Sequence, residues 1–79
     1  MSYKSLVETI VKSVVEHTDV INVEEEVEMG ARTFYVHVHP DDVGKVIGKT
    51  GRVVQAIRCV VSAVASKSRE KAYVKVVTD

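Results

Sequence analysis

The chain has 79 residues, 46% of them hydrophobic, and its eleven basic residues balance eleven acidic ones. This length suits one small domain, residues 1–79, and the hydrophobic content favours a folded chain over a disordered one. No signal-peptide pattern and no membrane-length apolar run are present, and Cys59 is the single cysteine. These features exclude a disulfide framework and a cysteine zinc site, and we expect a cytoplasmic protein with no membrane partner.

The charges are distributed unevenly along the chain, although they sum to zero. Residues 16–43 contain eight acidic residues and one basic residue, whereas residues 44–71 contain seven basic residues and one acidic residue. Such asymmetry can create a local positive field on a neutral protein. The second half is therefore the expected place for an anionic partner.

The first predicted element is a helix over residues 3–16. Its apolar residues recur at helical spacing and should pack on the core: Tyr3, Leu6, Val7, Ile10, Val11, Val14 and Val15. Ser5 with Glu8 fits a capping box, although Ser2 is an equally suitable N-cap.

Apolar and polar residues alternate over residues 20–29 and again over residues 32–39. This pattern predicts two strands of a hairpin with its turn at residues 30–31. The pattern predicts that the inner face holds Ile21, Val23, Val27, Met29, Phe34, Val36 and Val38. Glu25 interrupts this face, which suggests a bulge or a frayed edge. The remaining glutamates form a solvated outer face and not a catalytic acid, because no partner group for catalysis is visible.

His37 and His39 lie two residues apart on one strand face, and folding could bring His17 near them. This spacing alone does not make a metal site, because no thiol or clearly placed carboxylate completes the coordination shell. We therefore expect no metal, no cofactor, no small-molecule substrate and no enzymatic activity.

A short helix is predicted after Pro40, with Asp41 or Asp42 at its N-terminus. A long helix over residues 50–66 and a strand over residues 72–77 follow. The long helix has two apolar stripes. The first should cover the sheet with Val54, Ile57, Val61 and Val64, and the second comprises Ala56, Cys59, Val60 and Ala63.

Between these helices lies the segment Val46-Ile47-Gly48-Lys49-Thr50-Gly51-Arg52. Glycine permits a tight turn and close approach of a ligand backbone. The first amides of the following helix, together with Lys49 and Arg52, favour an anion such as a phosphodiester.

Two other interpretations of the segment remain. Gly48-Lys49-Thr50 matches the end of a nucleotide-binding P-loop, but the opening glycine would have to stand at position 43, which is Val43. The preceding segment also reads as helix, whereas a P-loop follows a strand. The simplest alternative is a helix–turn–helix connection in which the glycines only make the turn.

The segment resembles the GXXG loop of KH domains. Residues 46–58 follow the KH pattern V-I-G-x-x-G-x-x-I-x-x-I-R, with Val54 at the first helical isoleucine. The order helix, strand, strand, helix, GXXG, helix, strand resembles a type II KH domain over the whole chain. The resemblance implies an α+β fold, in which three helices cover one face of a three-stranded mixed sheet.

The chain also resembles the small stand-alone KhpA-like bacterial KH proteins. This resemblance implies single-stranded RNA binding, dimerisation with itself or with a Jag/KhpB-type KH protein, and an RNA chaperone role in post-transcriptional regulation, cell-wall homeostasis and cell shape. The expected RNA-binding residues are Lys45, Ile47, Gly48, Lys49, Thr50, Gly51, Arg52, Val53 and Val54. The groove would be completed by Val36 and Val38 and would lack aromatic residues.

An interaction module that dimerises with a larger RNA-binding partner, without binding RNA itself, is the alternative function. Lys49 and Arg52 argue against it, because such a module does not need them. The second stripe of the long helix (Ala56, Cys59, Val60 and Ala63) is the expected dimer interface, since the first stripe suffices to cover the sheet. Packing of this stripe under the first helix is the competing interpretation.

Overall fold

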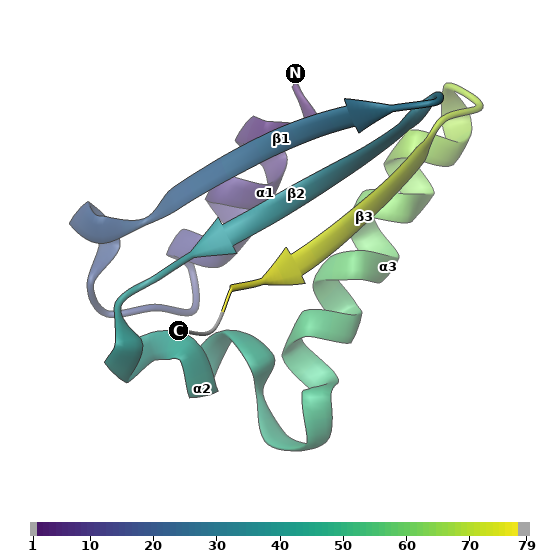
Figure 1. Ribbon diagram of the computed structural model, residues 1–79. Helices are drawn as coiled ribbons and strands as arrows, with labels where there is room; N and C mark the ends of the chain where they lie inside the picture. The colour runs from purple at the N-terminus through teal and green to yellow at the C-terminus, as the bar shows by residue number, and fades with distance from the viewer. Residues whose placement is uncertain (1, 78–79) are drawn as a thin grey trace.

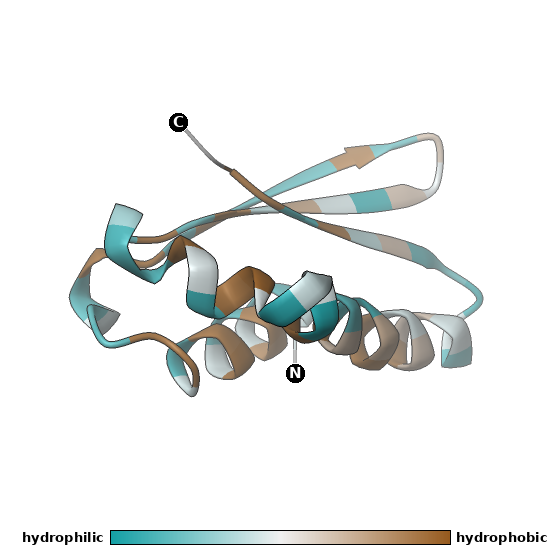
Figure 2. Cartoon of the chain, turned by 90° about the horizontal axis from the view of Figure 1, so that it is seen from below, coloured by the Kyte–Doolittle hydropathy of each residue, from teal (hydrophilic) through white to brown (hydrophobic). Residues whose placement is uncertain are grey.

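The computed structural model describes residues 2–77. The helices are α1 (Tyr3–Lys12), α2 (Val43–Ile47) and α3 (Arg52–Lys67), and the strands are β1 (Asn22–Glu28), β2 (Ala31–His37) and β3 (Lys71–Val76). β2 lies in the centre, antiparallel to β1 and parallel to β3. The helices cover one face of this sheet (Figures 1 and 2). The predicted α+β fold of the type II KH kind is confirmed.

The core lies between the sheet and the helices. Phe34 and Val36 of β2 are fully buried, as is Val46 of α2. Val74 of β3 completes the sheet side of the core, since it pairs with Phe34 in register. Burying this apolar face against α1 and α3 supplies most of the driving force for folding.

α1 is shorter than predicted, and only part of its predicted apolar face is buried in the core. It ends at Lys12, and the side chain of Ser2 caps its start by accepting a hydrogen bond from the Ser5 N–H at 3.1 Å. The buried residues of this segment are Val7, Val11 and Val15, while Leu6, Ile10 and Val14 are only half-buried. The wide apolar face is therefore divided into a core stripe and a second, flanking stripe.

The hairpin differs from the prediction near its tip. Val27 is 60% exposed and Met29 is 99% exposed, so no helix covers this end of β1. The turn is at Met29 and Gly30, and both residues have positive φ. Glu25 causes no bulge: the register is continuous, and its carboxylate accepts a hydrogen bond from Arg32 at 2.6 Å.

The core stripe of α3 also differs by one residue. Val54, Ile57 and Val61 are buried as predicted, but Val64 is 37% exposed and Ala65 is buried instead. Eleven residues separate Val54 from Ala65, about three full turns at 3.6 residues per turn. The stripe therefore keeps to the helix face nearest the sheet, and Val64 lies beside it.

Candidate nucleic-acid interface

The GXXG loop is a tight turn between α2 and α3. Gly48 has φ 75° and ψ 177°, and Gly51 has φ 78°, so both occupy backbone conformations that side chains disfavour. A Cβ on Gly48 would lie 2.4 Å from Cγ2 of Val53, so this position also has no space for a methyl group. The two glycines therefore allow the chain to reverse and enter α3 directly.

The two residues between the glycines project into solvent. Lys49 and Thr50 are exposed, as is Arg52 after the second glycine. Thr50 has φ 56°, a left-handed conformation that costs a non-glycine residue about 1–2 kcal/mol. Backbone strain of this kind concentrates at functional sites.

The start of α3 is open to an anion. Within residues 2–77 no side chain caps this helix, whose N-cap is Gly51. The N–H of Arg52 bonds to the carbonyl of Lys49, while the next amides lie at the positive end of the helix dipole. A phosphate placed against the loop would meet these amides and the cations of Lys49 and Arg52.

The surroundings of the loop do not fit a P-loop. The segment that enters it is α2 (Val43–Ile47), a helix, where a P-loop requires a strand. Together with Val43 at the position of the missing glycine, this removes the nucleotide-binding interpretation.

The start of α2 is attached to the connection between α1 and β1. Asp42 is fully buried, and its Oδ2 accepts hydrogen bonds from the backbone N–H and from Nδ1 of His17, each at 2.9 Å. Burial alone would raise the pKa of Asp42, but these hydrogen bonds outweigh burial and lower the pKa to about 2. The charged carboxylate of Asp42 thus accepts two hydrogen bonds and fixes the start of α2, the helix that leads into the loop.

Lys45 is not a free cation in this structure. Its Nζ lies 2.6 Å from Oε1 of Glu16 and 3.7 Å from Oδ1 of Asp42. The hydrogen bond and charge of Glu16 raise the pKa of Lys45, and the same contact lowers the pKa of Glu16. A phosphate would have to compete with two carboxylates for Lys45, so this residue is less suited to RNA than Lys49 or Arg52.

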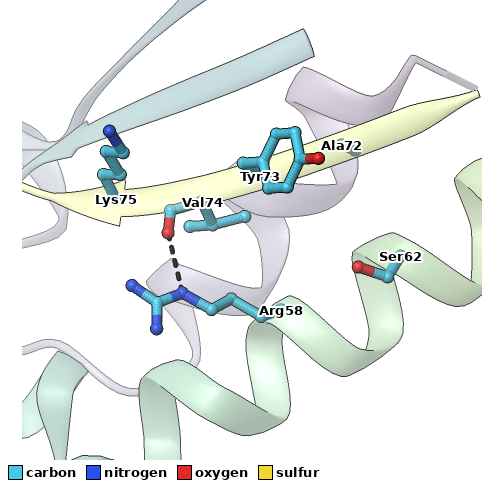
Figure 3. A pocket seen from close by; sticks show the side chains of 6 residues that line it. All are labelled: Arg58, Ser62, Ala72, Tyr73, Val74 and Lys75. Atoms are coloured by element: carbon cyan, nitrogen blue, oxygen red, sulfur yellow. Dashed lines mark hydrogen bonds between the residues drawn. The ribbon is translucent and has the colours of Figure 1, made fainter. Parts of the chain in front are cut away.

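A groove lies between α3 and the free edge of β3 (Figure 3). Nε of Arg58 donates a hydrogen bond to the carbonyl of Val74 at 2.9 Å, which joins the two elements. This groove is a 280 Å³ cavity lined by Arg58, Ser62, Ala72, Tyr73, Val74 and Lys75. None of these residues is among those expected from the sequence to bind RNA, although Arg58 closes the KH pattern.

Several expected groove residues lie elsewhere. The assignment of Val36 to the groove was wrong, because β2 is the central strand and the Val36 side chain is fully buried. Val38 is half-buried against the core. Val54 is buried as well. Arg52 and Val53 border a separate cavity on the α1 side of α3. Tyr73 also shows that the groove does not lack aromatic residues.

His17, His39 and Asp41 offer ligand atoms that lie within 4.8 Å of one another. The two imidazole rings are stacked with centroids 3.9 Å apart and planes inclined by 14°. Nδ1 of His39 accepts a hydrogen bond from the Asp41 N–H. Metal ligation uses the in-plane lone pairs of imidazole, and the lone pairs of stacked rings do not converge on one point. The arrangement therefore fits a stacked helix-capping pair better than a metal site.

The other side of α3 forms an apolar cavity of 440 Å³ with α1. It is lined by Leu6, Ile10, Val14, Arg52, Val53, Ala56, Ile57 and Val60. Of the predicted dimer stripe, Ala56 and Val60 border this cavity, while Cys59 and Ala63 lie on the more exposed side of α3. All four are exposed, so the stripe is not packed under α1.

Comparisons with known proteins agree with this architecture. The family model described as the KH domain of KhpA and KhpB matches residues 4–76. An RNA-binding protein KhpA of Oceanobacillus iheyensis is 41% identical over 73 residues, 92% of this chain and 97% of that protein. One from Clostridium perfringens is 42% identical over 74 residues, 94% of this chain and 99% of that protein.

Among the described helices, none is long and apolar enough to cross a membrane. The match of the family model and the extent of both relatives cover nearly the whole described chain. The chain therefore belongs to the KhpA/KhpB KH-domain family.

Proposed function

We propose that this protein binds single-stranded RNA by clamping its sugar–phosphate backbone in the loop from Gly48 to Gly51. The observation that carries this proposal is the loop geometry. Two glycines with positive φ bracket Lys49 and Thr50, whose side chains are exposed. The loop leads into the start of α3, which no side chain caps within residues 2–77. GXXG loops of KH domains clamp about four nucleotides in this way. The names of the relatives, RNA-binding proteins, support the same ligand class.

The bases of the clamped nucleotides would lie in the groove between α3 and β3. There they would meet Arg58 and the polar backbone edge of β3, whose Val74 carbonyl already accepts a hydrogen bond. Lys49 supplies a cation that forms no ion pair with a carboxylate within residues 2–77. With few phosphate contacts, one domain should bind weakly, as expected for a single KH groove.

The test is the double variant Lys49→Asp with Thr50→Asp, titrated with short single-stranded RNA. It keeps both glycines, changes only exposed side chains, and places two negative charges where phosphate should sit. We expect RNA binding to become undetectable while circular dichroism remains that of the folded chain. Lys4→Asp with Ser5→Asp is the matched control, since it makes the same charge change on exposed residues in α1.

We also propose that the protein associates through the apolar side of α3, with itself or with a second KH protein. The supporting observation is the 440 Å³ apolar cavity between α1 and α3, together with Val60 at 45% exposed and Val64 at 37% exposed. A two-fold pairing of this face would bring two GXXG loops into one assembly and raise weak affinity through effective concentration. Analytical ultracentrifugation tests self-association: a one-chain mass at every concentration contradicts a homodimer.

Within the cytoplasm, such an assembly suits an RNA chaperone that acts in post-transcriptional regulation, and we extend the proposal to the cell-wall and cell-shape role implied by the family resemblance. Crosslinking the protein to RNA in cells and sequencing the attached RNA tests this role. Enrichment of transcripts for cell-wall enzymes supports it, and a set without such transcripts contradicts it.

A further inference from the structure

The groove between α3 and β3 does not end at Arg58 but continues along the rest of the helix. A second cavity, of 310 Å³, adjoins the first and shares Ser62, Ala72 and Tyr73 with it. It extends the groove to Ser66, Glu70 and Lys71. Residues 58, 62 and 66 recur every four positions, so they line one side of α3 over its length. The groove is therefore longer than the part that Arg58 lines.

The β3 side of this extension alternates cations and an aromatic ring. Lys71, Tyr73 and Lys75 alternate with the buried Ala72 and Val74, so their side chains lie on the outer face of the sheet, at the free edge that borders the groove. The ring lies between the two lysines at a spacing of about 6–7 Å along the strand. Tyr73 is 51% exposed, so its ring is accessible for contact (Figure 3). An exposed ring between two cations matches the repeat of base and phosphate in a single nucleic-acid strand.

The charges along the groove favour an anion. Arg58, Lys71 and Lys75 line it, against the single carboxylate of Glu70. That carboxylate is engaged by Arg32, whose Nη2 lies 3.5 Å from Glu70 Oε1. Ser62 and Ser66 add hydroxyl groups, which donate to phosphate oxygens and to base edges.

The opposite edge of the sheet repels the same ligand. On the outer face, β1 presents Glu24, Glu26 and Glu28, whereas β3 presents Lys71 and Lys75. The sheet thus runs from acidic at β1 to basic at β3, and a polyanion is directed to the β3 edge. This polarity favours the β3 edge, which borders the groove, over the β1 edge of the sheet as a place for RNA.

We infer that the extended groove binds further unpaired nucleotides of the RNA strand held by the GXXG loop, with one base stacked on Tyr73 and the adjoining phosphates at Lys71 and Lys75. The inference rests on the proposed RNA binding and adds to it the length of RNA that one domain contacts. An RNA of about eight nucleotides should therefore bind more tightly than one of about four, the number a GXXG loop clamps.

The experiment is a titration of labelled oligouridylates of about four and about eight nucleotides with the parent chain, Tyr73→Ala and Tyr73→Phe. Tyr73→Ala should weaken binding of the longer RNA about tenfold, the loss expected for one base–aromatic stack, and weaken the shorter RNA less, because Tyr73 borders both cavities. Tyr73→Phe keeps the ring and should bind both as the parent does. Because Tyr73 is half exposed, circular dichroism should show all variants folded.

Tyr35→Ala is the matched aromatic control. Tyr35 lies on the same outer face, one strand inward, beside Glu26, whose charge raises its pKa. An equal loss in Tyr35→Ala would place the RNA across the sheet face and overturn the groove. Parent-like binding of the longer RNA by Tyr73→Ala would overturn this inference alone, provided Lys49→Asp with Thr50→Asp abolishes binding. If the parent binds neither RNA, the proposed function fails and this inference with it.

Discussion

On one long side of α3, the groove against β3 is lined by Arg58, Ser62 and the free edge of a strand. On the opposite side, the cavity against α1 is lined by Leu6, Ile10 and Val60. Ser62 and Val60 are two residues apart, which places them about 200° apart around the helix. The core stripe of α3 lies between these two flanks. A single helix thus separates a polar, basic groove from an apolar one.

This difference teaches how a domain of 79 residues can serve two kinds of partner. The basic groove suits a single nucleic-acid strand, whereas the lining of the opposite cavity is apolar apart from Arg52 and suits another protein surface. Because the two flanks do not overlap, RNA in one leaves the other free. The same separation allows each flank to be altered without direct effect on its opposite.

Gly48→Ala should have the largest effect, because it distorts the tight turn that leads into α3, the helix that carries both flanks. The new methyl group would lie 2.4 Å from Val53, which borders the α1 cavity, in a backbone conformation with φ 75°. We expect undetectable RNA binding and a loss of at least about 1–3 kcal/mol of unfolding free energy, measured by RNA titration and urea denaturation.

Gly44→Ala is the control for this change, since it adds the same methyl group to α2, where nothing lies within 4 Å. It should leave RNA binding intact and stabilise the chain by up to about 1 kcal/mol through helix propensity. If Gly48→Ala behaves like Gly44→Ala, the tight loop is not required for the clamp.

Val60→Asp is the next largest change and should act on the apolar flank alone. A buried charge at a self-association surface is costly, so we expect self-association to weaken at least tenfold, measured by sedimentation, while the chain stays folded. Val60 is 45% exposed in the single chain, which is why the fold should tolerate Asp. Binding of the short RNA by each domain should not change.

Ser62→Asp is its counterpart on the basic flank. It should leave sedimentation unchanged and weaken RNA binding, because it adds a negative charge beside Arg58.

Two outcomes would contradict the prediction for Val60→Asp. A folded dimer of this variant would place the interface elsewhere, and an unfolded chain would show that Val60 belongs to the core.

The element order, the sheet arrangement and the GXXG loop could be predicted from the sequence. Alternation in β2 correctly identified Phe34 as a core residue, and helical spacing in α3 correctly identified Ile57. Both predictions need only the repeat of apolar residues within one element. The loop could be predicted because its glycines and flanking apolar residues form a contiguous pattern. These features need no knowledge of what packs across the core.

The misses arise where tertiary geometry decides. Val64 and Ala65 are neighbours on α3, and only the angle at which the helix crosses the sheet determines that Ala65 is buried. Val27 fits the alternation but is 60% exposed, because no helix covers this end of β1. Tyr73 belongs to the groove because β3 is the edge strand beside α3, a placement that the spacing of its own residues does not contain.

Salt dependence should give the smallest effect and the sharpest distinction between the two flanks. A GXXG clamp that meets two or three phosphates should lose affinity with a slope of roughly 1.5–2 in log K against log salt. If Lys71 and Lys75 each meet one more phosphate, the longer RNA should add roughly 1.4 to that slope. Self-association through the apolar flank should not weaken with salt, since burial of apolar surface releases no counterions. A slope beyond about 5 would instead indicate a broad electrostatic surface over the basic half of the chain.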